Sequence, residues 1–197
     1  VRRSVTAVSL DLTGRRVLTE AATGAYAVTP VLAACAGAEE VVAATRATRY
    51  GTVAEVEEQT RRLAVELGVA DRIRIVAGGV PVDVLGRVDI VTNSGHVRPI
   101  DDRMAELLQP SAVVPLMFEA WEIDAGRHDV DLAALRNRGI RYAGTNERHP
   151  AVDVFSYLGP MAVQLLAEAA VSTYASRLLV VCDNPFMRYL SDGLERI

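Results

Sequence analysis

The stretch RVLTEAATGAYAVTPVLAACAGAEEVVAAT, from Arg16 to Thr45, decides the fold class. It opens with a short apolar run, Arg16–Glu20, passes through a turn that contains Gly24, and continues into a helix-like segment that begins near Pro30. A second apolar run, Val41–Thr45, closes the stretch. A strand, a helix and another buried strand in this order make a βαβ unit, so the two strands are expected to be parallel.

The same alternation continues along the rest of the sequence. Apolar side chains over Val53–Leu67 share one helical face, and Pro99 is expected to open another helix. Helical spacing over Ala151–Val171 contains Gly159-Pro160, which predicts either two helices or one kinked helix. Further strands are expected at Arg72–Ala77, Val88–Asn93, Ala112–Met117, Ile140–Gly144 and Leu178–Cys182. The sequence therefore predicts an α/β protein, Rossmann-like or flavodoxin-like, with a mostly parallel sheet and helices on both faces.

The composition excludes several classes of function. All 21 basic residues in the 197-residue chain are arginines, and without lysine there is neither Schiff-base catalysis nor a P-loop lysine. A net charge of −4 without a basic stripe gives no electrostatic footprint for nucleic acid. The apolar runs are far shorter than the roughly 20 residues of a membrane helix, and no signal-peptide core is recognisable. We therefore expect a cytoplasmic protein that binds neither nucleic acid nor membrane.

Residues that follow the expected strands are the candidate ligand contacts, because ligands bind beyond the carboxyl ends of parallel strands. These positions are rich in Asn, His, Arg, Glu and Trp, which orient polar ligands, although loops are often polar for structural reasons alone. We expect a small anionic substrate at this rim. The substrate-binding candidates are Asn93, Ser94, Gly95, His96, Arg98, Glu119, Trp121, Glu122, Thr145, Asn146, Glu147 and His149.

The turn after the first strand occupies the place of a phosphate-binding loop. Its amides and hydroxyls could hold an anion, but it has one glycine where a dinucleotide fingerprint has three. Where that fingerprint expects an acid after the second strand, the chain has Arg46 and Arg49, which suit a phosphate or carboxylate, or are solvated surface arginines. The cofactor-binding candidates are Thr23, Gly24, Tyr26, Arg46, Asp183 and Asn184.

Other kinds of site have weaker support. The three histidines have no partner four residues away, so no metal site is expected. Glu119 and Glu122 are compatible with an acid/base pair or with two acids at a helix start. No spacing indicates a covalent nucleophile, and no catalytic residue is assigned from the sequence.

Residues from Val88 to Arg177 resemble the substrate domain of D-2-hydroxyacid dehydrogenases of the formate/glycerate dehydrogenase type. Asp89–Ser94 matches the strand and substrate loop of that family, Asp129–Ala134 its "N-x-D-L-x-A" motif, and Gly139-Ile140 with Thr145-Asn146 its "G-I-x-V-x-N-T" segment. The resemblance implies an NAD(P)-dependent oxidoreductase of two domains, with a substrate-binding domain over residues 1–172. Residues 173–197 would then be the first strand and helix of a nucleotide-binding domain, so we expect this chain to be the first part of such a protein.

A second resemblance competes over residues 16–117. Val17–Gly24, the helical segment 53–67 and Gly68–Val76 are similar to a class I S-adenosylmethionine-dependent methyltransferase, which implies that cofactor near Thr19–Tyr26. The acids that hold the cofactor in such enzymes are replaced here by Thr45-Arg46 and by Ala77-Gly78-Gly79. A non-catalytic ligand-binding module is the third hypothesis. A homodimer is possible under each of them.

Overall fold

A computed structural model describes the chain except for residues 118–125, 127, 147–148, 152 and 197. The described residues form two compact units, Val1–Thr145 and Asn146–Ile197. We call them the first and second unit. In the second unit, the helix that follows residue 157 packs against the helix over 187–194. The domain boundary expected after residue 172 stays a prediction.

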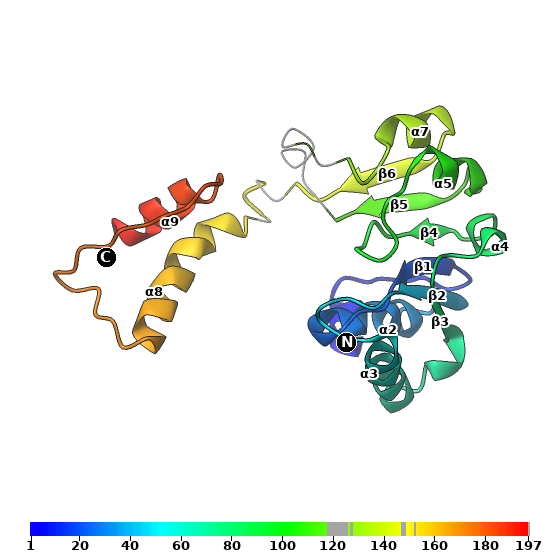
Figure 1. Cartoon of the computed structure of the whole chain (residues 1–197), viewed down its shortest axis with the longest axis horizontal. Coiled ribbons are helices and arrows are strands. Elements are labelled where there is room, and N and C mark those ends of the chain that lie inside the picture. The colour runs from blue at the N-terminus through cyan, green and yellow to red at the C-terminus, as the bar shows by residue number, and fades with distance from the viewer. Residues whose placement is uncertain (118–125, 127, 147–148, 152, 197) are drawn as a thin grey trace. The chain divides into compact units, whose positions relative to one another are not determined.

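The first unit contains a six-stranded, entirely parallel sheet with the strand order β3-β2-β1-β4-β5-β6 (Figure 1). This is the order of doubly wound Rossmann folds, and it confirms the predicted α/β class in its Rossmann-like rather than its flavodoxin-like form. The chain reverses its direction of progress between β1 and β4, which makes that point the switch point of the sheet. The strands are β1 (Arg16–Glu20), β2 (Glu40–Thr45), β3 (Ile73–Ala77), β4 (Ile90–Val91), β5 (Val113–Leu116) and β6 (Arg141–Gly144).

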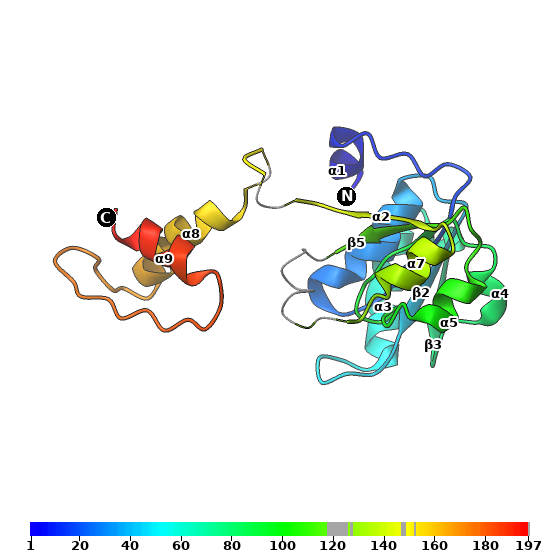
Figure 2. The ribbon, with the colours of Figure 1, turned by 90° about the horizontal axis from the view of Figure 1, so that it is seen from above.

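Helices cover both faces of this sheet. Along β1, Val17 packs in the core that includes residues of α2 and α3, while the next residue, Leu18, packs in the core under α4, α5 and α7. Successive strand residues point to opposite faces, so a strand buried on both sides is apolar along its whole length. Figures 1 and 2 both show α5 beside α7. The helices of the first unit are α1 (Arg2–Ala7), η1 (Gly24–Ala27), α2 (Val28–Cys35), α3 (Val53–Glu66), η2 (Ala70–Arg72), α4 (Val82–Leu85), α5 (Asp102–Leu107) and α7 (Leu132–Asn137).

The helix expected over residues 53–67 is α3, and its start is fixed by a capping box. The Thr52 hydroxyl accepts a hydrogen bond from the Glu55 amide at 3.2 Å, and the Glu55 carboxylate accepts one from the Thr52 amide at 2.7 Å. These bonds satisfy backbone donors that have no partner within the first turn of a helix. The connection between β2 and α3 therefore ends at a defined residue.

Two local expectations were wrong. The helix expected to open at Pro99 begins at Asp102, because the Asp101 carboxylate accepts a hydrogen bond from the Met104 amide and so forms the N-cap. The strand expected at Leu178–Cys182 is absent, and Leu179 and Val181 are 91% and 88% exposed. A strand forms only beside another strand, and no described segment of the second unit pairs with this one.

The second unit is a helix pair. Its elements are η3 (Phe155–Tyr157), α8 (Leu158–Glu168) and α9 (Met187–Leu194), and α8 contacts α9. At their crossing, a Cβ on Gly159 would lie 2.5 Å from the Gly193 Cα, so both positions need glycine. Helix α8 continues through Gly159-Pro160, because Pro160 lies in its first turn, where a missing amide proton leaves no hydrogen bond unmade.

Candidate functional site

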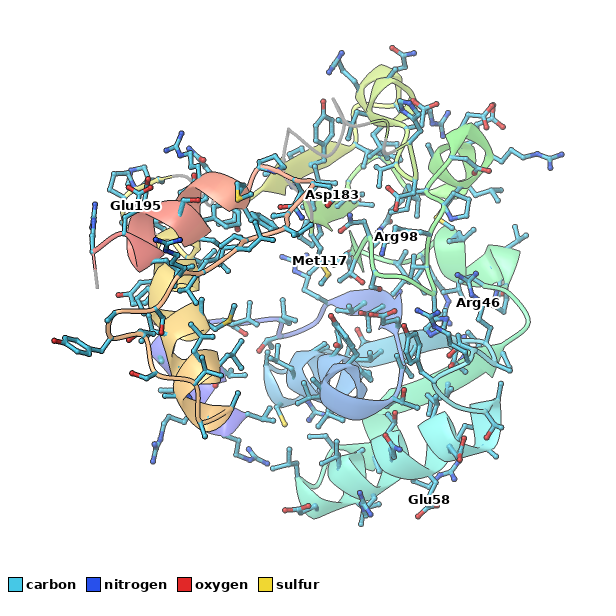
Figure 3. The ribbon with its side chains drawn as sticks, turned by 60° about the vertical axis from the view of Figure 1, so that its left-hand side comes forward. Arg46, Glu58, Arg98, Met117, Asp183 and Glu195 are labelled. Carbon is cyan, nitrogen blue, oxygen red and sulfur yellow. The ribbon has the colours of Figure 1, made fainter. Side chains whose placement is uncertain are left out.

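Loops that follow β1, β2 and β4 form the candidate site of the first unit. Figure 3 shows Arg46, Arg98 and Met117 on the loops after β2, β4 and β5. Because these strands are parallel, all three loops leave the same edge of the sheet.

The turn after β1 is held to its neighbours by backbone and side-chain bonds. The Ala21 amide donates to the Ala44 carbonyl at 2.9 Å, and the Gly24 amide donates to the Gln59 side-chain oxygen on α3 at 3.2 Å. Gly24 has a positive φ of 65°, which a glycine adopts without strain. The turn therefore enters η1 in a fixed position that places Tyr26 beside α3.

The connection after β2 contains a tight turn from Thr48 to Gly51. The backbones of these two residues exchange hydrogen bonds at 3.0 and 3.3 Å, and the Thr48 hydroxyl accepts a further bond from the Tyr50 amide at 3.1 Å. A Cβ on Gly51 would lie 2.5 Å from the Thr23 methyl group, so glycine allows this turn to pack directly on the turn after β1. The Arg49 guanidinium lies 4.7 Å from the centre of the Tyr50 ring.

The loop after β4 is bonded to both other loops. The His96 amide donates to the Glu20 carboxylate at 3.1 Å, and the Arg46 guanidinium donates to the Gly95 carbonyl at 3.0 Å. These two bonds connect the carboxyl ends of β1, β2 and β4 across the switch point of the sheet.

The three loops enclose a cavity of about 410 Å³, which we call the Arg46 pocket. It brings His96, predicted as a substrate contact, together with Thr23, Tyr26 and Arg46, predicted as cofactor contacts. The pocket is lined by Ala22, Thr23, Ala25, Tyr26, Arg46, Thr48, Tyr50, Val56 and His96.

The Arg46 pocket has a positive character. In the part of the chain that the structure describes, no residue that lines the pocket is acidic and no carboxylate lies within ion-pair distance of Arg46. Burial lowers the pKa of His96; Glu20 raises it and Arg46 lowers it further. His96 is therefore neutral near pH 7, and its buried Nδ1 has no hydrogen-bond partner among the described residues. The pocket thus offers a cation without a described counter-ion and a neutral imidazole in its lining.

Three predicted substrate contacts, Asn93, Ser94 and Arg98, have partners within the first unit. Asn93 is 1% exposed, and its side-chain oxygen accepts a hydrogen bond from the Met117 amide at 2.5 Å. The buried Ser94 hydroxyl lies 2.9 Å from the Thr92 hydroxyl. Arg98 pairs with Asp129 at 2.5 Å, so its charge is already compensated. Asn93 positions the loop that follows β5, and Arg98 ties the β4 loop to the segment before α7.

The remaining predicted contacts are not part of the Arg46 pocket as described. Glu119, Trp121, Glu122 and Glu147 lie outside the described residues. Thr145 is exposed at the end of the first unit. In the second unit, the His149 amide donates to the Asn146 carbonyl, the Asn184 side chain accepts from the Phe186 amide, and Asp183 is exposed. Whether these residues contact a ligand stays a prediction.

The sequence reasoning missed Thr48, Tyr50 and Val56. Val56 was recognised only as part of a helical face, and Thr48 and Tyr50 lie between Arg46 and the start of α3. Gly51 is a local signal of a turn, but a turn signal does not show which side chains of the turn line a pocket.

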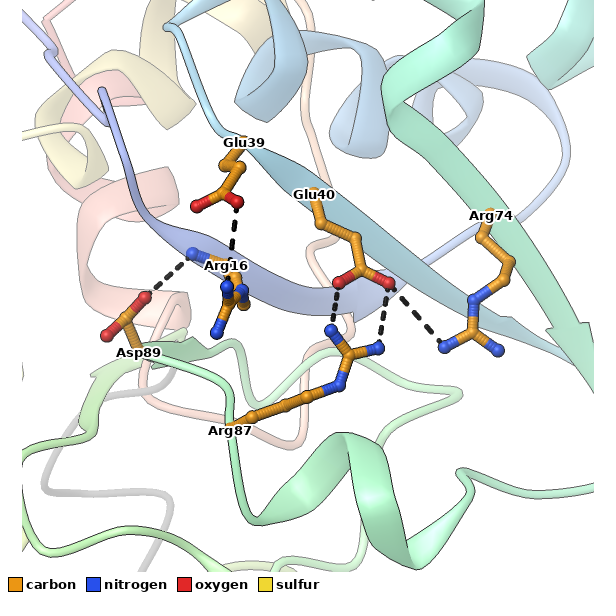
Figure 4. A network of polar contacts seen from close by, with 6 residues as sticks. All are labelled: Arg16, Glu39, Glu40, Arg74, Arg87 and Asp89. Carbon is orange, nitrogen blue, oxygen red and sulfur yellow. Dashed lines mark hydrogen bonds and ion pairs between the residues drawn. The ribbon is translucent and has the colours of Figure 1, made fainter.

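The opposite, amino-terminal edge of the sheet has a different character (Figure 4). Glu40 accepts two hydrogen bonds from the Arg87 guanidinium and lies 3.6 Å from Arg74. The Arg16 amide donates to the Asp89 carboxylate at 2.8 Å. The bond from Arg87 is the largest cause that holds the pKa of Glu40 below its usual value. This edge is a closed network of paired charges that joins β1 to β4 and β2 to β3.

A larger cavity, of about 600 Å³, lies over the face of β1, β4 and β5. Most of its lining is apolar, including Leu12, Leu32 and Val113, and its charged residues are Arg15, Asp89 and Arg141. It contains no histidine and no unpartnered buried polar atom among the described residues, so it offers less chemistry than the Arg46 pocket.

The turn after β1 does not fit the pyrophosphate of a dinucleotide in the usual position. Such a cofactor needs free amides in a glycine-rich turn, and after β2 either an acid for the ribose of NAD or an arginine for the 2′-phosphate of NADP. Here Ala21 and Ala22 replace glycines, the Gly24 amide is bonded to Gln59, and β2 ends at Thr45-Arg46. The methyltransferase hypothesis needs the same acid, so this substitution also weighs against S-adenosylmethionine.

No group of three or more His, Cys, Asp or Glu side chains is arranged to hold a metal ion in the part of the chain that the structure describes. None of the described helices is both long enough and apolar enough to cross a membrane.

Comparisons with known proteins show the fold. No family model matches the sequence, and no curated protein sequence matches it either. Among solved structures, a dipicolinate synthase from Bacillus halodurans is similar over 84% of this chain and 50% of its own, at 14% identity and a TM-score of 0.52. The corresponding dipicolinate synthase from Bacillus subtilis is similar over 86% and 52%, at 14% identity and a TM-score of 0.50.

A further similar structure is shikimate 5-dehydrogenase from Listeria monocytogenes in complex with shikimate and NAD, which matches over 72% of this chain and 49% of its own, at 13% identity and a TM-score of 0.47. The chain spans about half the length of these proteins. The first unit has a Rossmann-like fold, as its strand order shows. The likeness to the two dipicolinate synthases shows the fold alone, and none of the three proteins is named as a 2-hydroxyacid dehydrogenase.

Proposed function

We propose that the first unit binds the small anionic substrate of an NAD(P)-dependent oxidoreductase of the 2-hydroxyacid dehydrogenase type. The observation that carries this proposal is an arginine without a carboxylate partner among the described residues, Arg46, in the same pocket as a neutral histidine, His96. The Rossmann-like fold supports the oxidoreductase class, and the residues over 88–177 that resemble the 2-hydroxyacid type support the finer assignment.

Arg46 is suited to the carboxylate of the substrate. A guanidinium presents several N–H donors in one plane, and the bond to the Gly95 carbonyl uses only one of its terminal nitrogens while fixing its orientation. The bond to Gly95 therefore prepares Arg46 for a second, charged acceptor. Thr23 and Thr48 add hydroxyl groups to the lining of the same pocket.

His96 is suited to the hydroxyl or carbonyl group of such a substrate. Because its pKa is lowered, its imidazole is neutral near neutral pH and can accept the proton of a substrate hydroxyl through a ring nitrogen that faces the pocket. The bond from the His96 amide to Glu20 holds the backbone of this residue in place. The nicotinamide would be bound by residues outside Val1–Thr145, since the first turn does not fit it.

The experiment is titration calorimetry with the full chain. Lactate should bind to the unchanged protein, and Arg46→Ala should abolish the binding. Arg62→Ala, which removes an exposed arginine of α3 outside the pocket, is the matched control and should leave binding unchanged. Equal affinity of the unchanged protein and the Arg46→Ala variant would contradict the proposal.

A second titration tests the cofactor part of the proposal. NADH and NADPH should bind weakly or not at all to this chain. Tight stoichiometric binding would show that the glycine-poor turn after β1 holds a dinucleotide after all.

A further inference from the structure

We propose that the substrate in the Arg46 pocket carries a planar aromatic ring, and that Tyr26 and Tyr50 select it. In chemical terms the ligand is an aromatic 2-hydroxy acid or the corresponding 2-oxo acid. This inference rests on the proposed function and adds to it the part of the substrate that lies beyond the carboxylate.

The size of the pocket is the first argument. Its volume of about 410 Å³ lies within the range of roughly 300–1,000 Å³ that is usual for sites of drug-sized ligands. A three-carbon acid bound at Arg46 would fill only part of this space. A substrate that excludes water from the pocket must therefore have a larger group attached to its acid end.

The position of Tyr50 is the second argument. Tyr50 is 70% exposed, yet the backbone exchange between Thr48 and Gly51 and the bond from its own amide to the Thr48 hydroxyl hold it at the tip of a turn. Arg49 lies over the ring and donates to the Tyr50 hydroxyl, which fixes the side chain as well. An exposed aromatic ring held in this way presents an apolar surface to the pocket with little conformational entropy left to lose on binding.

Tyr26 provides a second ring from a separate element. It is 58% exposed on η1, whose first residue is bonded to Gln59 of α3. Tyr26 and Tyr50 line the same cavity although they lie on different sides of α2 and β2 in the sequence. Aromatic rings prefer offset-stacked or edge-to-face neighbours, so two tyrosines in one small pocket favour a planar ring over a bulky aliphatic group.

The charges in the pocket agree with this ligand. Arg46 lines the wall formed by the β2 loop, and Arg49 follows it three residues later beside the Tyr50 ring. The cation–π contact of Arg49 holds the Tyr50 ring in place beside the pocket. The carboxylate and the ring of one ligand would thus contact neighbouring residues of one loop.

The test is titration calorimetry of the full chain with four ligands: 3-phenyllactate, 3-cyclohexyllactate, lactate and adenosine 2′-monophosphate. Phenyllactate should bind about three- to tenfold more tightly than cyclohexyllactate, which has similar bulk without a planar ring. The preference for phenyllactate over lactate should be larger than the preference for phenyllactate over cyclohexyllactate. Tyr50→Leu should remove the preference for phenyllactate over cyclohexyllactate, and Tyr50→Phe should keep it.

Tyr157→Ala is the matched control, because Tyr157 is also 70% exposed but belongs to the second unit. It should change none of the four affinities. Circular dichroism melting of each variant shows whether the fold persists. Tyr26→Leu tests the second ring independently and should also weaken the preference for phenyllactate over cyclohexyllactate.

The outcomes separate this inference from the proposed function. Equal affinities for phenyllactate and lactate, both lost in Arg46→Ala, would overturn the inference and leave the proposed function standing. Absence of binding by all three acids would overturn both. Tighter binding of adenosine 2′-monophosphate than of phenyllactate, again dependent on Arg46, would show that the pocket is a nucleotide site and would overturn the inference.

Discussion

At the amino ends of the strands, Glu40 faces Arg87 and Arg74, and Asp89 accepts the Arg16 amide, so every charge of this network has a partner. At the carboxyl ends, Arg46 has a backbone carbonyl but no carboxylate, and the Nδ1 atom of His96 has no partner, among the described residues. Both edges belong to the same sheet and both rely on arginine. Paired charges stabilise the fold at the amino edge of the sheet, whereas the carboxyl edge keeps groups that can bind a ligand.

The largest expected effect is on ligand binding at the carboxyl edge. Arg46→Ala should weaken the binding of an aromatic 2-hydroxy acid by about 10- to 100-fold, because a hydrogen bond to a charged group is lost. Its melting temperature should stay close to that of the unchanged protein, since the described residues form no ion pair with Arg46. Calorimetry and thermal melting measure the two quantities. A large loss of stability with unchanged affinity would show that Arg46 stabilises the fold and does not bind the ligand, which would contradict the difference between the two edges.

The next effect is on stability at the amino edge. Glu40→Ala should lower the free energy of unfolding by about 1–3 kcal/mol, because it leaves Arg87 and Arg74 without their acceptor. Ligand affinity should not change. Urea denaturation measures the free energy, and Glu58→Ala, at an exposed position of α3, is the control that should have almost no effect.

A smaller effect on stability and ligand binding is expected where the loop after β2 touches the turn after β1. Gly51→Ala places a Cβ 2.5 Å from the Thr23 methyl group and should lower stability by about 1 kcal/mol while weakening ligand binding. Thr23→Ser removes that methyl group. The double variant should therefore regain both stability and affinity, and a double variant no better than Gly51→Ala would show that the contact does not shape the pocket.

The smallest effect concerns pH. Because the pKa of His96 is lowered in the folded protein, the unfolded chain binds more protons between the two pKa values. The contribution of His96 to stability is full above its unfolded pKa of about 6.5 and is lost as the pH falls below it. His96→Asn should therefore lose less stability than the unchanged protein between pH 7 and pH 5. His128→Asn, at an exposed position, should follow the unchanged protein in the same denaturation series.

The fold was largely predictable because its signals are local. The apolar runs indicated six of the strands within about two residues at either end, and the spacing over residues 53–67 indicated α3. The strand expected at Leu178–Cys182 shows the limit of such signals. Apolar composition indicates what a segment can form, but a strand also needs a neighbour to accept its hydrogen bonds.

The site was predictable in part. The rule that ligands bind beyond the carboxyl ends of strands selected Arg46 and His96, which line one pocket, because their positions follow from the strand boundaries alone; their contact with a ligand stays a prediction. It also selected Arg98, whose partner Asp129 lies 31 residues away and left no trace in the local pattern. Tyr50 was missed for the same reason, since its role depends on the packing of Gly51 against Thr23 across the switch point.

The capping box of α3 has a consequence for how a ligand would arrive. Thr52 and Glu55 fix the start of the helix at the residue after Gly51, so the loop that holds Arg46 and Tyr50 is clamped at both ends before any ligand is present. The Arg46 pocket is thus expected to be formed before the ligand binds and not to close over the ligand afterwards. Association should then follow a single exponential whose rate rises in proportion to ligand concentration, without a plateau from a slow rearrangement.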